Sequence, residues 1–448
     1  MGEPANSPET AVTIAQRVRA GTLDAADVVE STLDRIARHD DVFHAFVDVH
    51  ADEARAAAVA LDRAPDRAEF PLAGVPVAIK DVVPMAGHTL REGSAAAPME
   101  PATTDHPVVT RLRQAGAILV GRTAVPELCV WGTTDVPGRI TRNPRNPAYT
   151  AGGSSGGAGA AVAAGMVPLA HGTDGLGSIR IPAANCGVFG IKPGRGLVPS
   201  ELGANSWFGM GENGVLATTV GDAALMLSVL AAEPGLADVA TPEPLRVGIA
   251  PSSPSPVVSV DERWSAAAHD AGSLLADLGH RTTPTRLPYP VDLLPLLARW
   301  TLGTAADAEE FDDELLQPRT RRHIGVGRML RSVNPRSLDR LEAAFSRVFE
   351  GIDLVVTPTL LRPGPAAIAW SEKSWVANML SNVRYASFTP VWNLLGWPAA
   401  SVPFGVHPVS RTPTAVQIAG PPGAESAILG LAGEIERARA WERVADLS

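Results

Sequence analysis

Apolar residues in the first 70 positions recur at helical spacing and predict three helices. The first helix covers about residues 8–20. In the second, Val29, Leu33 and Ile36 recur at intervals of four and three residues, which places them on one face. The third helix is alanine-rich and spans about residues 51–64. The chain therefore opens with helices before any segment has the pattern of a strand.

From residue 71 onward, short runs of consecutive apolar residues predict buried β-strands. The runs occupy residues 75–80, 117–121, 245–250 and 353–358. Strands that are continuously apolar and alternate with helices are typical of a mixed or parallel sheet covered on both faces. The pattern therefore predicts an α/β fold. The Arg-rich part of the chain from about 250 to 350 is predicted to be helical.

Residues 151–180, AGGSSGGAGAAVAAGMVPLAHGTDGLGSIR, contain nine glycines. Glycine permits positive φ and close backbone approach, so 152–159 and 172–177 are predicted to be loops that present backbone N–H groups. A helix of small residues is predicted between them, at 159–165. Spacing alone leaves two interpretations open, a tightly packed Gly/Ala helix and a catalytic loop. No G-x-x-x-x-G-K-[ST] sequence is present to indicate a P-loop.

The composition excludes several classes of protein. Hydrophobic residues make up 45% of the 448 residues, which is enough for a large core and excludes a disordered chain. The formal charge of −10 argues against a nucleic acid or an anionic membrane as the main partner. The small-residue run 156–170 is too short to span a bilayer, and the polar N-terminus is unlike a secretory signal. We therefore expect a cytoplasmic protein.

The cysteines and histidines show no pattern of a disulfide framework or a metal site. The two cysteines are Cys129 and Cys186, and neither C-x-x-C nor H-E-x-x-H occurs. The sequence therefore predicts no metal and no cofactor. Cys186 is predicted to be a small packed residue. His88 and His171 are predicted to have packing or surface roles.

Lysine is rare in this chain, and one lysine ends a predicted strand. Three of the 38 basic residues are lysines, namely Lys80, Lys192 and Lys373. A lysine can lose its proton, which an arginine cannot. Lys80 follows an apolar run, so we expect burial to lower the pKa of its amine. Taken alone, Lys80 also fits a surface position at the end of a strand.

Several motifs together resemble the amidase signature family of Ser/Ser/Lys hydrolases. They are GVPVAIKD at 74–81, GRT at 121–123, PE at 126–127, GGSSGG at 152–157, SIRIPA at 178–183, CGVFGIKP at 186–193 and, near the C-terminus, TPVWNLLGWPAASVPFG and AVQIAGPPG. The resemblance covers most of the chain and is weakest between about 235 and 350. The combined pattern is far more specific than a glycine-rich loop alone.

The resemblance implies three catalytic residues. Lys80 matches the catalytic lysine, Ser154 matches a bridging serine that follows a cis peptide bond, and Ser178 matches the nucleophile. A serine hydroxyl needs a base to remove its proton, and a lysine can be that base only when it is neutral. Ser154 would relay the proton from Ser178 to Lys80, and the relay would then protonate the leaving amine.

The resemblance also implies an oxyanion hole and residues that brace it. The oxyanion hole is expected to use backbone N–H groups of Gly175, Leu176, Gly177 and Ser178. The bracing residues are expected to be Ser155, Asp174 and Arg180.

The chain departs from the family pattern inside this loop. The family usually has T-D-T-G-G-S, whereas this sequence has T-D-G-L-G-S at 173–178. If the family glycine has positive φ, Leu176 would be strained unless Gly175 absorbs the turn. We expect the Leu176 side chain to project into the acyl pocket and narrow it, which would restrict the range of substrates.

Aromatic residues are candidates for the walls of the substrate pocket. The candidates are Trp131, Trp207, Phe208 and Trp392. A cluster of tryptophans fits a protein core as well as a binding surface. The family pattern favours a neutral, apolar or aryl acyl group, whereas Arg384 could instead hold a carboxylate.

The resemblance implies a single amidase signature domain over residues 1–448, with a large mixed β-sheet covered by helices on both faces. Its expected parts are N-terminal helices at about 8–65, a signature core at about 71–235, a variable helical part at about 250–350, and strands and helices at about 351–440. A homodimer is common in the family and is the expected assembly.

The predicted function is hydrolysis of the C–N bond of a small linear amide through a Ser178 acyl-enzyme, with release of ammonia or an amine. Three alternatives remain open. One is an acyltransferase or esterase with the same residues. Another is the A subunit of a tRNA-dependent amidotransferase, which would need partner subunits. The third is a ligand-binding homologue without activity, for which Leu176 is the sole support.

Overall fold

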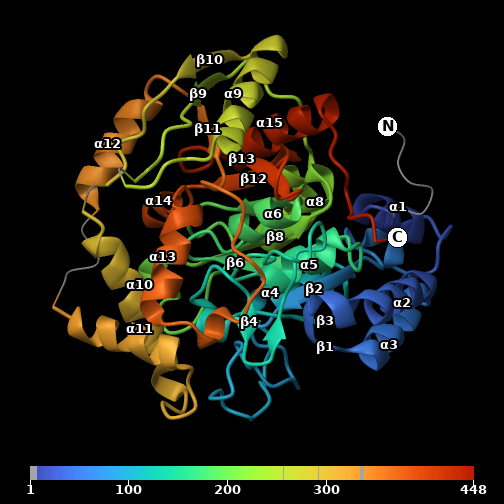
Figure 1. The fold of residues 1–448 in the computed structure, drawn as a ribbon. Helices are drawn as coiled ribbons and strands as arrows, with labels where there is room; N and C mark the ends of the chain where they lie inside the picture. Colours follow the sequence, from blue (N-terminus) through green and yellow to red (C-terminus); the bar gives the residue numbers. More distant parts are fainter. Residues whose placement is uncertain (1–7, 256, 291, 333–337, 448) are drawn as a thin grey trace.

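The computed structural model describes residues 8–255, 257–290, 292–332 and 338–447, and its centre is a mixed sheet of eleven strands (Figure 1). In spatial order the strands are β1 (Phe46–Val49), β3 (Ile118–Thr123), β2 (Pro76–Lys80), β6 (Leu169–Asp174), β8 (Glu212–Ala217), β7 (Phe189–Lys192), β12 (Ala399–Val406), β13 (Pro413–Ala419), β11 (Leu354–Pro358), β9 (Arg246–Ile249) and β10 (Arg281–Pro284). A separate ribbon pairs β4 (Asp135–Val136) with β5 (Arg139–Ile140).

Parallel and antiparallel pairs both occur in the large sheet, which confirms the predicted mixed sheet. β2 lies between β3 and β6 and is parallel to both, and β9 is parallel to β10 and β11. The other neighbours in the sheet pair antiparallel. The four strands predicted from apolar runs correspond to β2, β3, β9 and β11.

The edge strand β10 lies in the part of the chain that was predicted to be helical. Its sequence is RTTP, and these residues are exposed or half-buried. It therefore has no run of apolar side chains that would indicate a strand. Pairing with β9, rather than burial, defines this strand.

Helices cover both faces of the sheet (Figure 1). In chain order they are α1 (Ala11–Arg19), α2 (Ala25–Phe43), α3 (Ala51–Asp62), α4 (Pro107–Gln114), α5 (Gly156–Ala163), α6 (Arg180–Cys186), α7 (Ser206–Gly209), α8 (Val220–Ala231), α9 (Glu262–Asp277), α10 (Leu294–Asp307), α11 (Pro318–Met329), α12 (Asp339–Phe349), α13 (Trp375–Ala386), α14 (Pro390–Leu395) and α15 (Glu425–Ala438). The three predicted N-terminal helices are α1, α2 and α3, and the predicted stripe of Val29, Leu33 and Ile36 is buried.

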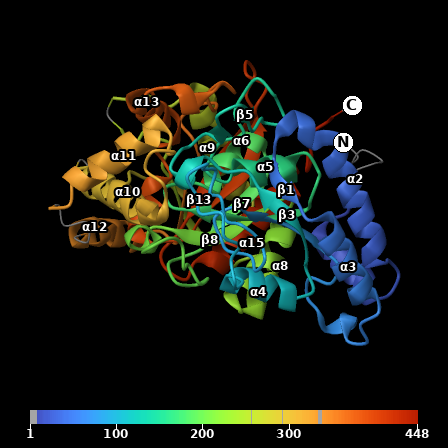
Figure 2. The same cartoon turned by 90° about the horizontal axis from the view of Figure 1, so that it is seen from below.

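Two groups of helices lie at opposite ends of the molecule (Figure 2). Helices α2 and α3 pack together beside β3 at one end. At the other end α10 packs against α11, and α11 packs against α13. In the described ranges, every helix is too short or too polar to cross a membrane.

The glycine-rich segments are more regular than predicted. Helix α5 begins at Gly156 rather than near residue 159, and β6 extends through Gly172 to Asp174. A Cβ at Gly157 would collide with the backbone of Ala45 and Ala124. Glycine therefore lets the first turn of α5 lie directly on neighbouring backbone, which is a packing role rather than a loop-forming one.

Candidate active site

Lys80 is the last residue of β2 and its side chain is completely buried. Its Nζ atom lies 2.7 Å from Oγ of Ser154, 2.6 Å from Oγ1 of Thr173 and 3.3 Å from the Thr173 carbonyl oxygen. Burial lowers the pKa of the Lys80 amine, because the charged form is poorly solvated there. Burial therefore makes the neutral form of this lysine easier to reach than in water, and its amine contacts a serine hydroxyl.

Ser154 lies in the turn that leads from Ala151 into α5, and the Gly153–Ser154 peptide bond is cis. A Cβ at Gly153 would lie 2.8 Å from the carbonyl carbon of Gly132, so the turn is pressed against the chain next to Trp131. Ser154 is 1% exposed. This packing holds its hydroxyl at Lys80.

Ser178 and Ser154 both line the same small cavity. The Ser155 N–H donates to the Ser178 carbonyl oxygen at 3.1 Å, which ties the two serine segments together. Among the described residues, no hydrogen bond joins the Ser178 hydroxyl to Ser154. Contacts of this kind often tighten only when substrate binds.

The loop from Asp174 to Arg180 is fixed by a fully buried ion pair. Nη2 of Arg180 lies 2.9 Å from Oδ1 of Asp174, and its Nε donates to Oδ2, also at 2.9 Å. Arg180 also donates to Gln417 at 2.7 Å and to Asn393 at 2.6 Å. Burial alone would raise the pKa of Asp174, but the Arg180 guanidinium holds it well below its usual range. The carboxylate is therefore ionised and available to backbone donors.

Asp174 uses that charge to shape the loop that carries Ser178. The Gly177 N–H donates to Oδ1 at 2.6 Å and the Ile179 N–H donates to Oδ2 at 3.2 Å. From the sequence, the Gly177 N–H was expected to bind the oxyanion, but in the structure this N–H donates to Asp174 instead. Gly177 has φ of 121°, and a Cβ there would collide with Thr389. Gly177 therefore forms the turn, and the other three expected donors remain candidates for the oxyanion.

The backbone of Leu176 is not strained by a positive φ, which the sequence analysis had considered. It is absent from the positive-φ residues, because the positive φ of this turn falls on Gly177. The Leu176 carbonyl oxygen accepts a hydrogen bond from Thr389 Oγ1 at 2.7 Å. Leu176 lines the larger of the two cavities at this site, which is mainly apolar.

Gly175 leaves room for the indole of Trp207. A Cβ at position 175 would lie 2.7 Å from Cε3 of Trp207, too close for any ordinary contact. Trp207 Nε1 donates to Oδ2 of Asp307 at 2.6 Å, which fixes the ring from the other side. Trp207 thereby forms part of the wall next to the Ser178 loop.

Two cavities meet at Ser178. The larger one has a volume of about 280 Å³ and is lined mainly by apolar side chains, including Trp131, Trp207 and Leu176. Tyr289 and Trp300 also line it, and neither was singled out from the sequence. They come from the segment between 250 and 350, where the resemblance is weakest.

The smaller cavity, of about 40 Å³, contains two acidic side chains that the sequence did not indicate. Glu92 and Asp307 line it together with Ser154, Ser178 and Cys129. Burial, helped by the negative charges of Asp307 and Asp81, raises the pKa of Glu92 to about 8. Burial also raises the pKa of the Cys129 thiol to about 12, so the thiol is protonated. The smaller cavity thus adds two carboxyl groups, which the larger cavity lacks.

Three residues proposed for substrate contacts lie elsewhere. Trp392 is buried in an aromatic cluster, with its ring centroid 5.6 Å from that of Phe345. Phe208 is half-buried and lines neither cavity, although its neighbour Trp207 lines both. Arg384 is exposed on α13. Among the described residues, one group of side chains is placed to hold a metal ion, namely His50, Glu53 and His88, and none of these lines either cavity.

Comparison with known proteins defines the class of this fold and site. The Amidase family profile matches residues 27–429. The chain therefore belongs to the amidase signature family. It is 39% identical over 443 residues to "Putative amidase AmiB2" of Mycobacterium tuberculosis (strain ATCC 25618 / H37Rv), covering 95% of each chain. It is 38% identical to "Putative amidase AmiA2" of the same strain, covering 96% of this chain and 91% of that one.

Solved structures agree over the full length. A 6-aminohexanoate cyclic dimer hydrolase complexed with substrate superposes with a TM-score of 0.89 at 27% identity, covering 98% of both chains. A bacterial aryl acylamidase of the amidase signature family gives a TM-score of 0.80 at 26% identity, covering 98% of this chain and 97% of that chain. The predicted family and fold class are therefore confirmed.

Proposed function

We propose that this protein hydrolyses the C–N bond of a carboxylic amide, with Ser178 as nucleophile and Lys80 and Ser154 as its proton relay. The observation that carries the proposal is the 2.7 Å contact between Nζ of a completely buried Lys80 and Oγ of Ser154. A neutral amine in that position can accept a proton from the serine hydroxyl. Membership of the amidase family supports the same chemistry.

The reaction proceeds in two halves. Ser178 Oγ attacks the amide carbonyl carbon while its proton passes to Ser154, whose own proton passes to Lys80. The tetrahedral intermediate collapses, the C–N bond breaks, and the leaving nitrogen takes the proton back through the same relay. Water then attacks the acyl-enzyme and gives a proton to the same relay. The relay returns that proton to the Ser178 oxygen as the ester bond breaks, which releases the carboxylic acid and regenerates the Ser178 hydroxyl.

Backbone donors near Ser178 stabilise the negative oxygen of the intermediate. The proposed donors are the N–H groups of Gly175, Leu176 and Ser178, since the Gly177 N–H donates to Asp174. Loss of one such donor typically costs about 3–4 kcal/mol of transition-state stabilisation. The ion pair between Asp174 and Arg180 keeps the loop in the shape that presents them.

The two cavities suggest how an amide is oriented. The acyl group occupies the larger apolar cavity, which suits an uncharged aliphatic or aryl group. The leaving nitrogen faces the smaller cavity, beside the carboxyl groups of Glu92 and Asp307. A charged acyl group is disfavoured, because the larger cavity is lined mainly by apolar side chains.

The test is an amide panel with ammonia or amine release as the readout. Primary amides and anilides of increasing acyl size are incubated with the wild-type protein, with Ser178→Ala and with Lys80→Ala. We expect both substitutions to lower kcat by about 10³-fold or more. Lys373→Ala, which removes an exposed lysine, serves as the matched control and should leave the rate unchanged. Release that persists in Ser178→Ala would refute the proposed nucleophile.

An acyltransferase would use the same relay with an amine or alcohol in place of water. The amide panel distinguishes it, because hydrolysis releases the free acid without an added acceptor. Acid release that depends wholly on an added amine would identify acyl transfer as the function.

A further inference from the structure

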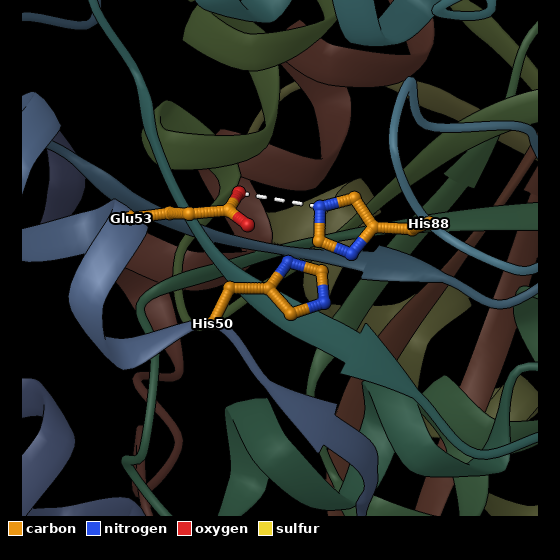
Figure 3. Close-up of side chains that lie close together, drawn as sticks. All are labelled: His50, Glu53 and His88. Carbon is orange, nitrogen blue, oxygen red and sulfur yellow. Dashed lines mark hydrogen bonds and ion pairs between the residues drawn. The ribbon is translucent and has the colours of Figure 1, made fainter. Parts of the chain in front are cut away.

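Three side chains outside the two cavities converge at one point near the start of α3. They are His50, the residue before the helix, Glu53 in its first turn, and His88 from the segment between β2 and α4. One potential ligand atom from each lies within 4.8 Å of the others (Figure 3). Nε2 of His88 is 3.2 Å from Oε2 of Glu53, and the two imidazole rings stack with centroids 3.9 Å apart.

His50 presents an unpartnered nitrogen to this cluster. The residue is 9% exposed, and its Nδ1 atom is buried without a hydrogen-bond partner. Its Nε2 lies 3.0 Å from Oδ1 of Asp48. If Nε2–H donates to that carboxylate, Nδ1 is left with a free lone pair. Figure 3 shows the His50 ring facing the Glu53 carboxylate and the His88 ring.

We propose that His50, Glu53 and His88 form a binding site for a divalent transition-metal cation of the zinc class. Two imidazole nitrogens and one carboxylate are a common ligand set for zinc, with water in the fourth position. Asp48 contacts the other ring nitrogen of His50, and a carboxylate in that position typically orients a metal-binding histidine. The site supplies an otherwise unsatisfied buried nitrogen with a partner.

The side chains are placed so that a small movement completes the site. Ligand atoms around a tetrahedral zinc lie about 3.3 Å apart, so the cluster has to contract slightly and the stacked rings have to tilt. The Glu53 side chain is 59% exposed, which leaves it free to adjust. The His88 side chain is 16% exposed, so the cluster is open to an ion from solvent. His50 is the fixed member.

Binding would join two separate parts of the chain. It would link α3 to the segment that carries His88, which continues to Glu92 in the smaller cavity. Asp48, which contacts His50, also forms an ion pair with Arg122. Nη1 of Arg122 in turn lies 3.0 Å from Oδ1 of Asp81, the residue after Lys80. The metal site is therefore connected to the end of β2 through a chain of ion pairs.

The experiment is a zinc titration of the metal-stripped full-length protein, followed by calorimetry and by thermal unfolding. The variants are His88→Ala and Glu53→Gln, with His269→Ala as the control because that histidine is exposed on α9. We expect one ion per chain, a Tm that rises with zinc concentration, affinity lowered more than about tenfold in His88→Ala and Glu53→Gln, and no change in His269→Ala.

A cobalt titration of the wild-type protein provides a second reading that does not depend on the variants. Cobalt in a tetrahedral site with nitrogen and oxygen ligands should give visible absorption bands that saturate at one equivalent and disappear when zinc is added. The proposal is overturned if the wild-type protein binds zinc no more tightly than His88→Ala, or if cobalt gives only the spectrum of the hydrated ion.

Discussion

The indole of Trp207 packs against Gly175 and occupies the space that a side chain at position 175 would need. The missing Cβ of Gly175 would lie 2.7 Å from Cε3 and 2.9 Å from Cζ3 of the indole. The family usually has a threonine here, so the change to glycine goes together with an indole packed against the Ser178 loop. Glycine at this position thus makes room for an indole that lines both cavities at Ser178.

The first prediction follows from that contact. Gly175→Thr should displace Trp207 and overpack the loop, at a cost of about 1–3 kcal/mol in the free energy of unfolding. We expect kcat/KM to fall about tenfold or more on any amide that the wild-type protein hydrolyses. The double variant Gly175→Thr/Trp207→Ala should recover stability. Equal stability of Gly175→Thr and wild type in urea unfolding would contradict the tight fit.

The second prediction concerns Leu176, which lines the larger cavity without backbone strain. Leu176→Gly should enlarge the cavity and shift the preference toward bulkier acyl groups. A single methylene in an apolar pocket is worth about 1–3 kcal/mol of discrimination, so the ratio of kcat/KM for bulky over small amides should rise at least about tenfold. Leu176→Ala should give an intermediate shift. Unchanged ratios in both variants would mean that Leu176 does not limit the substrate.

The third prediction is the pH dependence of the acylation rate. The proposed mechanism needs neutral Lys80. Burial lowers the pKa of its amine, so the neutral form appears at lower pH than for an exposed lysine, whose pKa is about 10.4. The rate should rise with pH and level off below that value. Glu92, with a pKa raised to about 8, titrates in the same cavity. Glu92→Gln should keep the rise if Lys80 causes it, and loss of the rise would assign it to Glu92.

The fourth prediction addresses the buried ion pair. Arg180→Ala leaves the Asp174 charge buried without its partner, which typically costs about 3–5 kcal/mol in the free energy of unfolding. Urea unfolding measures this directly. Arg246→Ala removes an exposed arginine that pairs with Asp353, and it should change stability little. A loss in Arg180→Ala no larger than in this control would show that the Asp174 loop does not depend on the pair.

The motif residues of the site were accessible from the sequence because each has a fixed chemical task. Lys80 and Ser154 are 74 positions apart in the chain, and the structure brings their side chains to 2.7 Å. The family pattern also indicated the Arg180 brace. The sequence could not show that Asp174 accepts a hydrogen bond from the Gly177 N–H, because that bond depends on the φ of a single glycine.

The walls of the substrate cavity were predicted less well, because residue type does not determine which way a side chain faces. Val391 and Leu394 of α14 line the larger cavity, while Trp392 between them packs in the core with Phe345. Trp300 lines the cavity from α10, a region without a recognisable motif. Its place depends on how that helix packs, which apolar periodicity does not specify.

The cluster of His50, Glu53 and His88 was also not predicted from the sequence. Its histidines are 38 positions apart and belong to no metal-binding motif, so only the fold brings His88 to the start of α3. The prediction of no metal was based on the absence of C-x-x-C and H-E-x-x-H, and those patterns detect only sites with closely spaced ligands.

The most direct test of the central claim is the intact mass of the protein after treatment with a fluorophosphonate, which labels activated serines without requiring a substrate. The account predicts one adduct on the wild-type protein, retained in Ser273→Ala, an exposed serine on α9, and in Lys373→Ala. It predicts no adduct on folded Ser178→Ala or Lys80→Ala. An adduct that persists in Ser178→Ala, or a folded wild-type protein that takes up none, would contradict it.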